Sequence, residues 1–203
     1  PADIVGAVTA DGVESGMEVI RQIFPKLNMT PGILLAPGWS ENALVSAGLQ
    51  AKTSHINGVF NCVCIVDIDS STAGATKYDD VKRQKEKQAV TSANCYAVWL
   101  YAKVGDVIYA GSAMAAAATV ATDANNGDIP NVSPDNKPIS ISAACLKDGT
   151  EVLLDQEQAN VVNSFGVATW LNMNGFRLWG NNTACYPGNT DPKDRWFSVR
   201  RFF

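Results

Sequence analysis

The sequence predicts an α/β fold: a mostly parallel sheet flanked by helices in three layers, with a β-hairpin region added in the C-terminal third. Three apolar runs, at residues 33–36, 59–68 and 95–101, have the continuous hydrophobic character of strands buried on both faces of a parallel sheet. Helical patterns separate these runs, and strands that alternate with helices favour parallel pairing. Near the end, the Asn174-Gly175 step between two short apolar runs indicates a hairpin.

The first ten or so residues are expected to be loop or edge strand, and a helix is expected from Met17. Its apolar face consists of Met17, Ile20, Phe24 and Leu27. Pro25 lies inside this pattern and should break or kink the helix. After the strand at 33–36, Ser40 is predicted to cap a second helix. The apolar side chains of that helix are Leu44, Val45 and Leu49.

The middle of the chain continues the alternation of strands and helices. The strand at 59–68 ends in an acidic turn, and a polar helix is expected at 78–90. Residues 104–110 are predicted as either a hairpin partner of the strand at 95–101 or a fourth strand. Gly111-Ser112 then begins a helix that runs through several alanines to about residue 122.

The last third begins with a long loop at 123–138, rich in Asn, Asp, Gly and Pro. A loop of this length in a compact domain is usually functional or interfacial. Beyond it we expect a strand at 139–145, a helix at 155–165 with Asp155 as its N-cap, and a hairpin of 167–171 with 176–179. The prediction is one domain over residues 1–203, with a main α/β part at about 1–124 and a completing part at about 125–203.

Composition excludes several classes of protein. The 203 residues are 46% hydrophobic, enough for a core without disulfides or metals, and the net charge of −4 argues against a nucleic-acid partner. The basic run at 82–87 is interpreted as a solvated helix face. No apolar run reaches about 18 residues, so membrane insertion is not expected. The chain has five cysteines, an odd number, and four of them lie in apolar runs. This favours reduced thiols packed in the core, and therefore synthesis in the cytoplasm.

Ser40 follows a predicted buried strand, as the nucleophile of a G-x-S-x-G elbow does. Asn42 stands where that motif needs its second glycine. His55 is the single histidine of the chain. A serine hydroxyl is a poor nucleophile until a base accepts its proton. The cap of a helix is therefore the favoured role for Ser40.

Asp67 and Asp69 follow a buried strand in the D-x-D pattern of Mg²⁺-dependent phosphohydrolases of the haloacid-dehalogenase type. That chemistry also needs a lysine and a later acidic pair for the metal, and no later pair follows a strand. The phosphohydrolase is kept as the alternative function. The main prediction has no catalytic residues, no cofactor and no metal site.

Two further features are left open by the residues. Trp179 and Trp196 are equally consistent with packing inside the fold and with anchoring an interface. A generic binding module that uses the loop at 125–138 cannot be separated from a structural role.

Several segments, in this order and spacing, resemble the tail sheath proteins of contractile phages and R-type bacteriocins. They are residues 31–40 (PGILLAPGWS), 65–69 (IVDID), 123–130 with 133–139 (SPDNKPI), 159–167 (ANVVNSFGV), 178–184 (LWGNNTA) and 196–201 (WFSVRR). One departure is Asn182, where the family usually has Arg, so any salt bridge at that position is in doubt.

The resemblance implies a central domain likened to subtilisin in fold, without its catalytic triad. It implies a structural subunit that polymerises helically around a tail tube and contracts to drive it through a cell envelope. Expected partners are neighbouring sheath subunits, the tail tube protein, and baseplate and terminator proteins. The chain is expected to be truncated at both ends, to lack the arms that join subunits, and to be monomeric or weakly associated alone. It would be made in the bacterial cytoplasm for a virion tail sheath or phage-tail-like particle.

Overall fold

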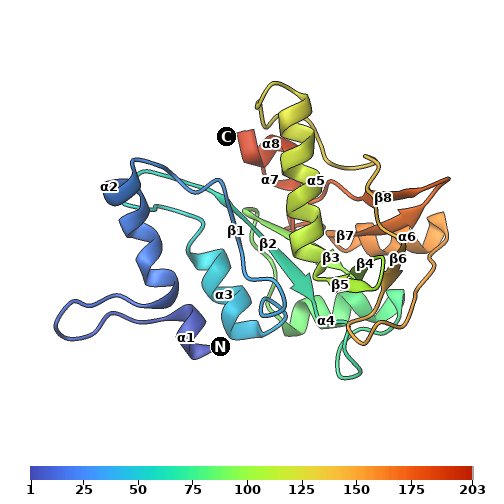
Figure 1. The fold of residues 1–203 in the computed structure, drawn as a ribbon, viewed down its shortest axis with the longest axis horizontal. Helices are drawn as coiled ribbons and strands as arrows, with labels where there is room; N and C mark the ends of the chain where they lie inside the picture. Colours follow the sequence, from blue (N-terminus) through green and yellow to red (C-terminus); the bar gives the residue numbers. More distant parts are fainter. Residues whose placement is uncertain (203) are drawn as a thin grey trace.

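The computed structural model describes residues 1–202 and contains a five-stranded sheet in the order β1-β2-β3-β7-β8 (Figure 1). Its strands are β1 (Ile33–Leu35), β2 (Val63–Ile68), β3 (Cys95–Trp99), β7 (Val167–Asn172) and β8 (Phe176–Trp179). The first four are mutually parallel, and β8 pairs antiparallel with β7. The mostly parallel sheet and the added C-terminal hairpin are confirmed.

A second sheet was not predicted. It is antiparallel, in the order β5-β4-β6, with β4 (Tyr101–Val104), β5 (Val107–Tyr109) and β6 (Ala143–Cys145). The run at 95–101 is divided between the two sheets because Leu100 takes a left-handed conformation, with φ of 84°. Residues 107–109 are a hairpin partner, as one of the two predictions had it, but they pair with β4 and not with the strand before the break.

The helices between strands agree with the predicted order. They are α3 (Ala43–Ala51), the 3₁₀ turn η2 (Tyr78–Asp80) with α4 (Val81–Lys87), α5 (Gly111–Asn125) and α6 (Gln156–Ser164). Asp155 caps α6 as predicted, since its carboxylate accepts the Gln158 backbone N–H while the Gln158 side chain accepts the Asp155 N–H.

The N-terminal region differs from its prediction. Residues Ala2–Val5 form a short helix, α1, instead of loop or edge strand. The helix expected from Met17 is a 3₁₀ segment, η1 (Gly16–Gln22), followed by α2 (Ile23–Leu27). Pro25 lies in the first turn of α2, where its missing N–H costs no helical hydrogen bond.

Ser40 does not cap the second helix, so that prediction is wrong. Asn42 is the N-cap of α3, and its Oδ1 accepts the backbone N–H of Leu44 at 3.0 Å. The chain makes a turn between β1 and α3 that delays the helix by two residues, and Asn is as good a cap as Ser. The turn leaves Ser40 fully buried and free for another role.

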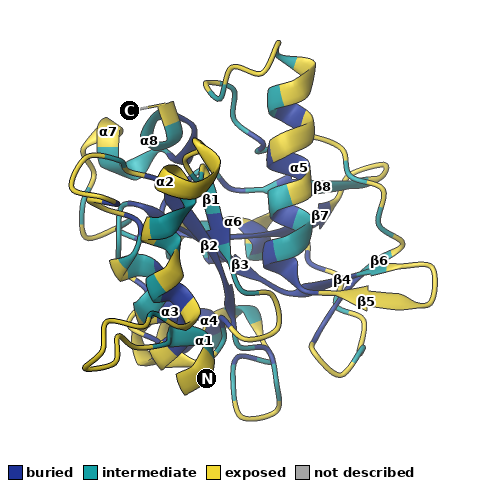
Figure 2. Cartoon of the chain, turned by 60° about the vertical axis from the view of Figure 1, so that its left-hand side comes forward, coloured by how far each residue is buried: buried dark blue, intermediate teal, exposed yellow. Residues whose placement is uncertain are grey.

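The core is continuous across the large sheet and reaches the C-terminal helix α8 (Phe197–Phe202), which follows the short helix α7 (Pro192–Arg195). Every residue of β2 is buried (Figure 2). Phe197 at the start of α8 is fully buried and stacks on Tyr96 of β3, with ring centroids 4.1 Å apart. The C-terminal segment is therefore part of the core.

We expect Phe197→Ala to lower the free energy of unfolding by about 3–5 kcal/mol, because it leaves a cavity against Tyr96. Urea denaturation measures the change. Leu44→Ala, at an exposed position of α3, is the matched control and should change stability by less than about 0.5 kcal/mol. Equal effects of the two substitutions would show that α8 is not part of the core.

Candidate functional site

The structure brings Ser40 and Asp67 together at the carboxyl ends of β1 and β2, where enzymes with open α/β sheets bind their ligands. The Ser40 hydroxyl donates to Asp67 Oδ2 at 2.8 Å and accepts the Asp67 backbone N–H at 2.9 Å. Ser112, in the first turn of α5, completes the cluster. Its backbone N–H donates to Asp67 Oδ1 and its hydroxyl to Asp67 Oδ2, both at 2.6 Å.

The environment of Asp67 is that of a structural carboxylate. The side chain is 2% exposed. Burial raises its pKa above the ordinary value, while hydrogen bonds from Ser112 and Ser40 oppose that rise. Both oxygens already accept hydrogen bonds, so the carboxylate is occupied in linking three segments. Sequence reasoning missed Ser112, although its place at a helix start after a strand was visible.

Gly111 permits this arrangement. A Cβ at this position would lie 2.4 Å from the Leu100 carbonyl oxygen. Only glycine therefore allows α5 to begin so close to the end of β3.

Asp69 does not join Asp67 in a metal site. Its Oδ1 accepts the Ser71 backbone N–H at 2.9 Å, and its own N–H donates to Gln88 Oε1 at 2.9 Å. Within residues 1–202, no group of three or more His, Cys, Asp or Glu side chains is arranged to hold a metal ion. The phosphohydrolase alternative has no support.

His55 lies away from Ser40. It is exposed in a turn before the amino end of β2, with φ of 58°, whereas Ser40 contacts the carboxyl end of that strand. The elbow hypothesis therefore lacks its base.

A cavity with a volume of about 570 Å³ lies at the amino edge of the sheet. It is lined by α4, by the turn at 185–189, and by Phe165 and Ala184. Lys85 in its wall is 7% exposed, which corrects the prediction that the whole run at 82–87 is solvated. Lys85 Nζ donates to the carbonyl oxygens of Phe165, Ala184 and Tyr186, at 2.5, 2.7 and 3.0 Å.

Burial lowers the pKa of Lys85 to about 8. The ammonium group nevertheless donates hydrogen bonds to three backbone carbonyls, and these bonds link α4 to the loops after α6 and β8. It is not free to act as a nucleophile.

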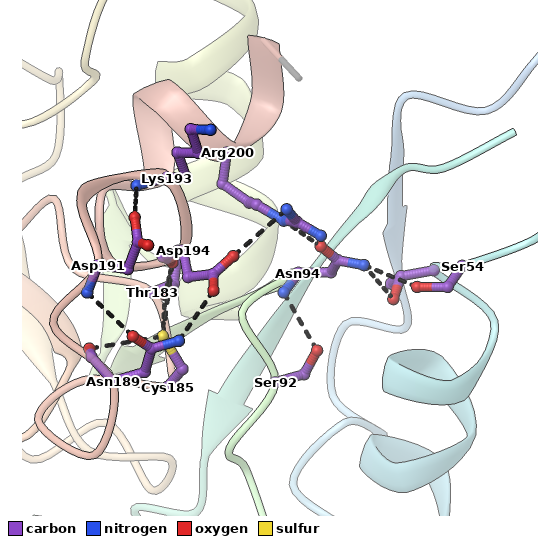
Figure 3. Close-up of polar contacts among 11 residues, drawn as sticks. Ser54, Ser92, Asn94, Thr183, Cys185, Asn189, Asp191, Lys193, Asp194 and Arg200 are labelled. Carbon is purple, nitrogen blue, oxygen red and sulfur yellow. Dashed lines mark hydrogen bonds and ion pairs between the residues drawn. The ribbon is translucent and has the colours of Figure 1, made fainter.

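A polar network beside this cavity fixes the C-terminal segment to the sheet (Figure 3). Arg200 Nε donates to Asn94 Oδ1 at 2.5 Å, and Asn94 Nδ2 donates to the Ser54 hydroxyl at 2.9 Å. Arg200 also lies 3.4 Å from Asp194 Oδ1, and Asn189 Nδ2 donates to the other oxygen of Asp194 at 2.8 Å. Side chains from before β2, before β3 and around α7 and α8 thus converge.

The segments that carry the family resemblance also bond to one another. Asn182 is 4% exposed, its Nδ2 donates to Asn163 Oδ1 at 2.9 Å, and its Oδ1 accepts from Arg195 Nε at 2.9 Å. The Gly180 N–H donates to Asp135 Oδ1 at 2.6 Å. These residues build the fold, and Asn182 accepts a charge-assisted hydrogen bond from Arg195 while it donates a neutral one to Asn163.

Trp179 and Trp196, whose roles the sequence left undecided, both make contacts within the chain. Trp179 Nε1 donates to Asn160 Oδ1 at 2.9 Å. The Arg195 guanidinium lies 4.2 Å from the ring centroid of Trp196. The loop that follows α5 also has an internal role, since Asn136 N–H donates to the Leu178 carbonyl and Ile139 N–H to that of Phe176, covering the outer edge of β8.

No protein-family model matches the chain. A putative prophage major tail sheath protein of Pseudomonas aeruginosa (strain UCBPP-PA14) is 26% identical over 189 residues, covering 89% of this chain and 45% of that protein. The tail sheath protein of Burkholderia phage BcepMu is 24% identical over 213 residues, covering 98% of this chain and 43% of that protein. The chain therefore spans less than half the length of these curated relatives.

Solved structures show the same fold. A chain in the baseplate of the anti-feeding prophage matches with a TM-score of 0.63 and 17% identity, over 96% of this chain and 47% of that one. A chain in the contracted sheath complex of the PVC extracellular contractile injection system matches with a TM-score of 0.62 and 18% identity, over 92% of this chain and 48% of that one.

Both sequence relatives are tail sheath proteins, and the polar residues at the sheet edge are occupied by contacts inside the fold. The proteins to which the chain is similar in sequence are therefore structural ones. More particularly, the chain is related to the contractile tail sheath proteins, and the resemblance found in its motifs is confirmed.

We expect Asp67→Ala to lower the free energy of unfolding by about 3 kcal/mol, because it leaves the donors of Ser40 and Ser112 buried without an acceptor. Asp67→Asn keeps one acceptor oxygen and should cost clearly less. Urea denaturation of both variants tests this. An alanine variant as stable as the asparagine variant would contradict the structural role.

Lys85 should give the protein a stability that rises with pH. In the unfolded chain a lysine loses its proton near about 10.4, but folding lowers the pKa of Lys85 to about 8. The unfolded state therefore binds more protons between these values, and unfolding becomes harder as pH rises through them. Denaturation at several pH values should show this rise in the wild type and its loss in Lys85→Met. Parallel pH profiles would contradict it.

Proposed function

We propose that this chain is the folded core of a contractile tail sheath subunit, which polymerises helically around a tail tube and contracts to drive the tube through a cell envelope. The observation that carries the proposal is similarity along nearly the whole chain. The match to the BcepMu tail sheath protein covers 98% of it, and the match to the contracted PVC sheath structure covers 92%.

The proposed partners are neighbouring sheath subunits, the tail tube protein, and the baseplate and terminator proteins of a virion tail or phage-tail-like particle. The structural neighbours come from baseplate and sheath complexes, which supports assembly of this kind. We propose synthesis in the bacterial cytoplasm, and the five cysteines, all free thiols in the structure, agree with a reducing compartment.

We further propose that the chain is a single three-layer core domain, similar in fold to subtilisin, within a longer subunit whose arms join neighbouring subunits. Segments from both ends of the chain pack on the same sheet, which supports a single domain. Ile4 and Val5, near the start of the chain, pack against the core that contains the strands, and Phe197, near its end, stacks on Tyr96.

Such a core suits a subunit that moves as a rigid body. Contraction of a helical sheath is a rearrangement of whole subunits, which requires that the interior does not deform. Close packing and hydrogen-bonded buried polar groups give that property. Asp67 and Lys85 each link segments from distant parts of the sequence and so oppose internal shear.

Immunogold electron microscopy tests the proposal directly. Antibodies raised against this chain should label the outside of contractile tails, along the shaft, in particles from the bacterium or phage that encodes it. Antibodies absorbed beforehand with the purified chain are the control and should give no label. Particles with tails that remain unlabelled, while the antibodies detect the protein elsewhere in the same culture, would refute the proposal.

A further inference from the structure

The end of the molecule that carries α2 has an exposed apolar surface. Its members are Phe24, Leu27, Met29 and Val59, which are 38%, 64%, 65% and 72% exposed. The ring of Phe24 lies 4.9 Å from that of Phe60, so α2 and the turn before β2 form one continuous surface. We call these four residues the α2 patch. Contiguous apolar surface of this kind marks interaction sites on soluble proteins.

A second apolar surface lies on the edge of the small sheet. Every residue of β5 is exposed, and with Val104 it forms what we call the β5 patch: Val104, Val107, Ile108 and Tyr109. β5 pairs only with β4, so its other edge is open. By contrast, residues 150–152 bond along β6, and residues 136–139 bond along β8. Natural sheets usually protect an open edge with lysine, proline or a cover, and β5 has none of these.

The charges beside the two patches are complementary. Lys26 lies in α2, whereas Asp106 lies in the turn before β5 and Asp148 is next to Gly149, which is close to the Ile108 side chain. Among residues 1–202, none of these three charges forms a salt bridge. Neighbouring charges are already neutralised in pairs, Arg21 with Glu14, Lys52 with Glu18 and Lys103 with Glu151. In the described part of the chain, the α2 patch thus has an unpaired positive charge beside it, Lys26, and the β5 patch has two unpaired negative charges, Asp106 and Asp148.

The two patches belong to elements on opposite sides of the fold. Figures 1 and 2 show α2 and β5 on opposite sides of the molecule. Two unlike, complementary surfaces on opposite sides give a head-to-tail contact that does not close on itself, the kind that builds filaments. A symmetric contact of the α2 patch with itself would oppose Lys26 to Lys26, which is unfavourable.

We propose that the α2 patch of one copy of this chain docks on the β5 patch of the next copy. The apolar side chains supply the centre of the contact, and Lys26 opposite Asp106 and Asp148 sets its orientation. This inference rests on the proposed function, because it specifies one of the subunit contacts that a helical sheath needs.

Sedimentation velocity of the purified chain at increasing concentration tests the contact. The wild type should be monomeric when dilute and should associate weakly, into species larger than a dimer, as its concentration rises, which agrees with the weak association expected of the chain alone. Leu27→Asp, which disables the α2 patch, and Ile108→Asp, which disables the β5 patch, should each weaken association at least about tenfold. Val120→Asp, at a site on α5 that is 59% exposed, is the matched control and should associate like the wild type.

Mixing the two disabled variants gives the decisive result. Leu27→Asp retains the β5 patch and Ile108→Asp retains the α2 patch, so together they should form a dimer that grows no further. Charge reversal adds a second readout, since Lys26→Glu should weaken association and Asp106→Lys with Asp148→Lys should restore it. Circular dichroism confirms that each variant folds.

A wild type that stays monomeric at all concentrations, association unchanged in both aspartate variants, or a mixture that does not dimerise would each overturn the inference. None of these results would refute the sheath function, which is decided by the labelling of tails. Conversely, unlabelled tails with intact head-to-tail association would refute the sheath function and leave the contact standing.

Discussion

The buried carboxylate of Asp67 is the constraint around which the sheet is organised. A carboxylate that is 2% exposed must have donors on its oxygens, and the donors come from the turn after β1 and from the start of α5. This requirement fixes where the chain leaves β1 and where α5 begins. The missing side chain of Gly111 then lets α5 approach the end of β3. The same edge of an α/β sheet hosts active sites in many enzymes, but here its polar groups are used to close the fold.

The sequence predicted the parts of the fold that depend on hydrophobic pattern. The strands β2 and β3 appeared as apolar runs because both of their faces are buried, and so did the partly buried edge strand β1. The Asn174-Gly175 turn identified the hairpin of β7 and β8. The break at Leu100 could not be predicted, because nothing in an apolar run shows that one residue adopts a positive φ. The cap of α3 was misplaced because Ser40 and Asn42 are both good caps, and only the position of Asp67 decides between them.

The internal contacts of polar residues were the least predictable feature. Lys85 lies among solvated lysines, and its burial depends on loops that are about 80 to 100 positions away in sequence. Asn182 gave the opposite lesson. Its departure from the expected pattern raised doubt about a salt bridge, and the structure shows Asn182 buried and hydrogen-bonded to Asn163 and Arg195. The motifs that carry the resemblance hold distant segments of the chain together.

The anchoring of α8 has a mechanical consequence. Arg201 donates two hydrogen bonds to the Asp123 carboxylate of α5, at 2.7 and 2.8 Å. Arg200 donates to Asn94, and Phe197 is buried against Tyr96. A pulling force on α8 therefore loads three attachments at once instead of peeling them apart one after another. Tension applied there would pass into α5 and the central sheet through all three attachments.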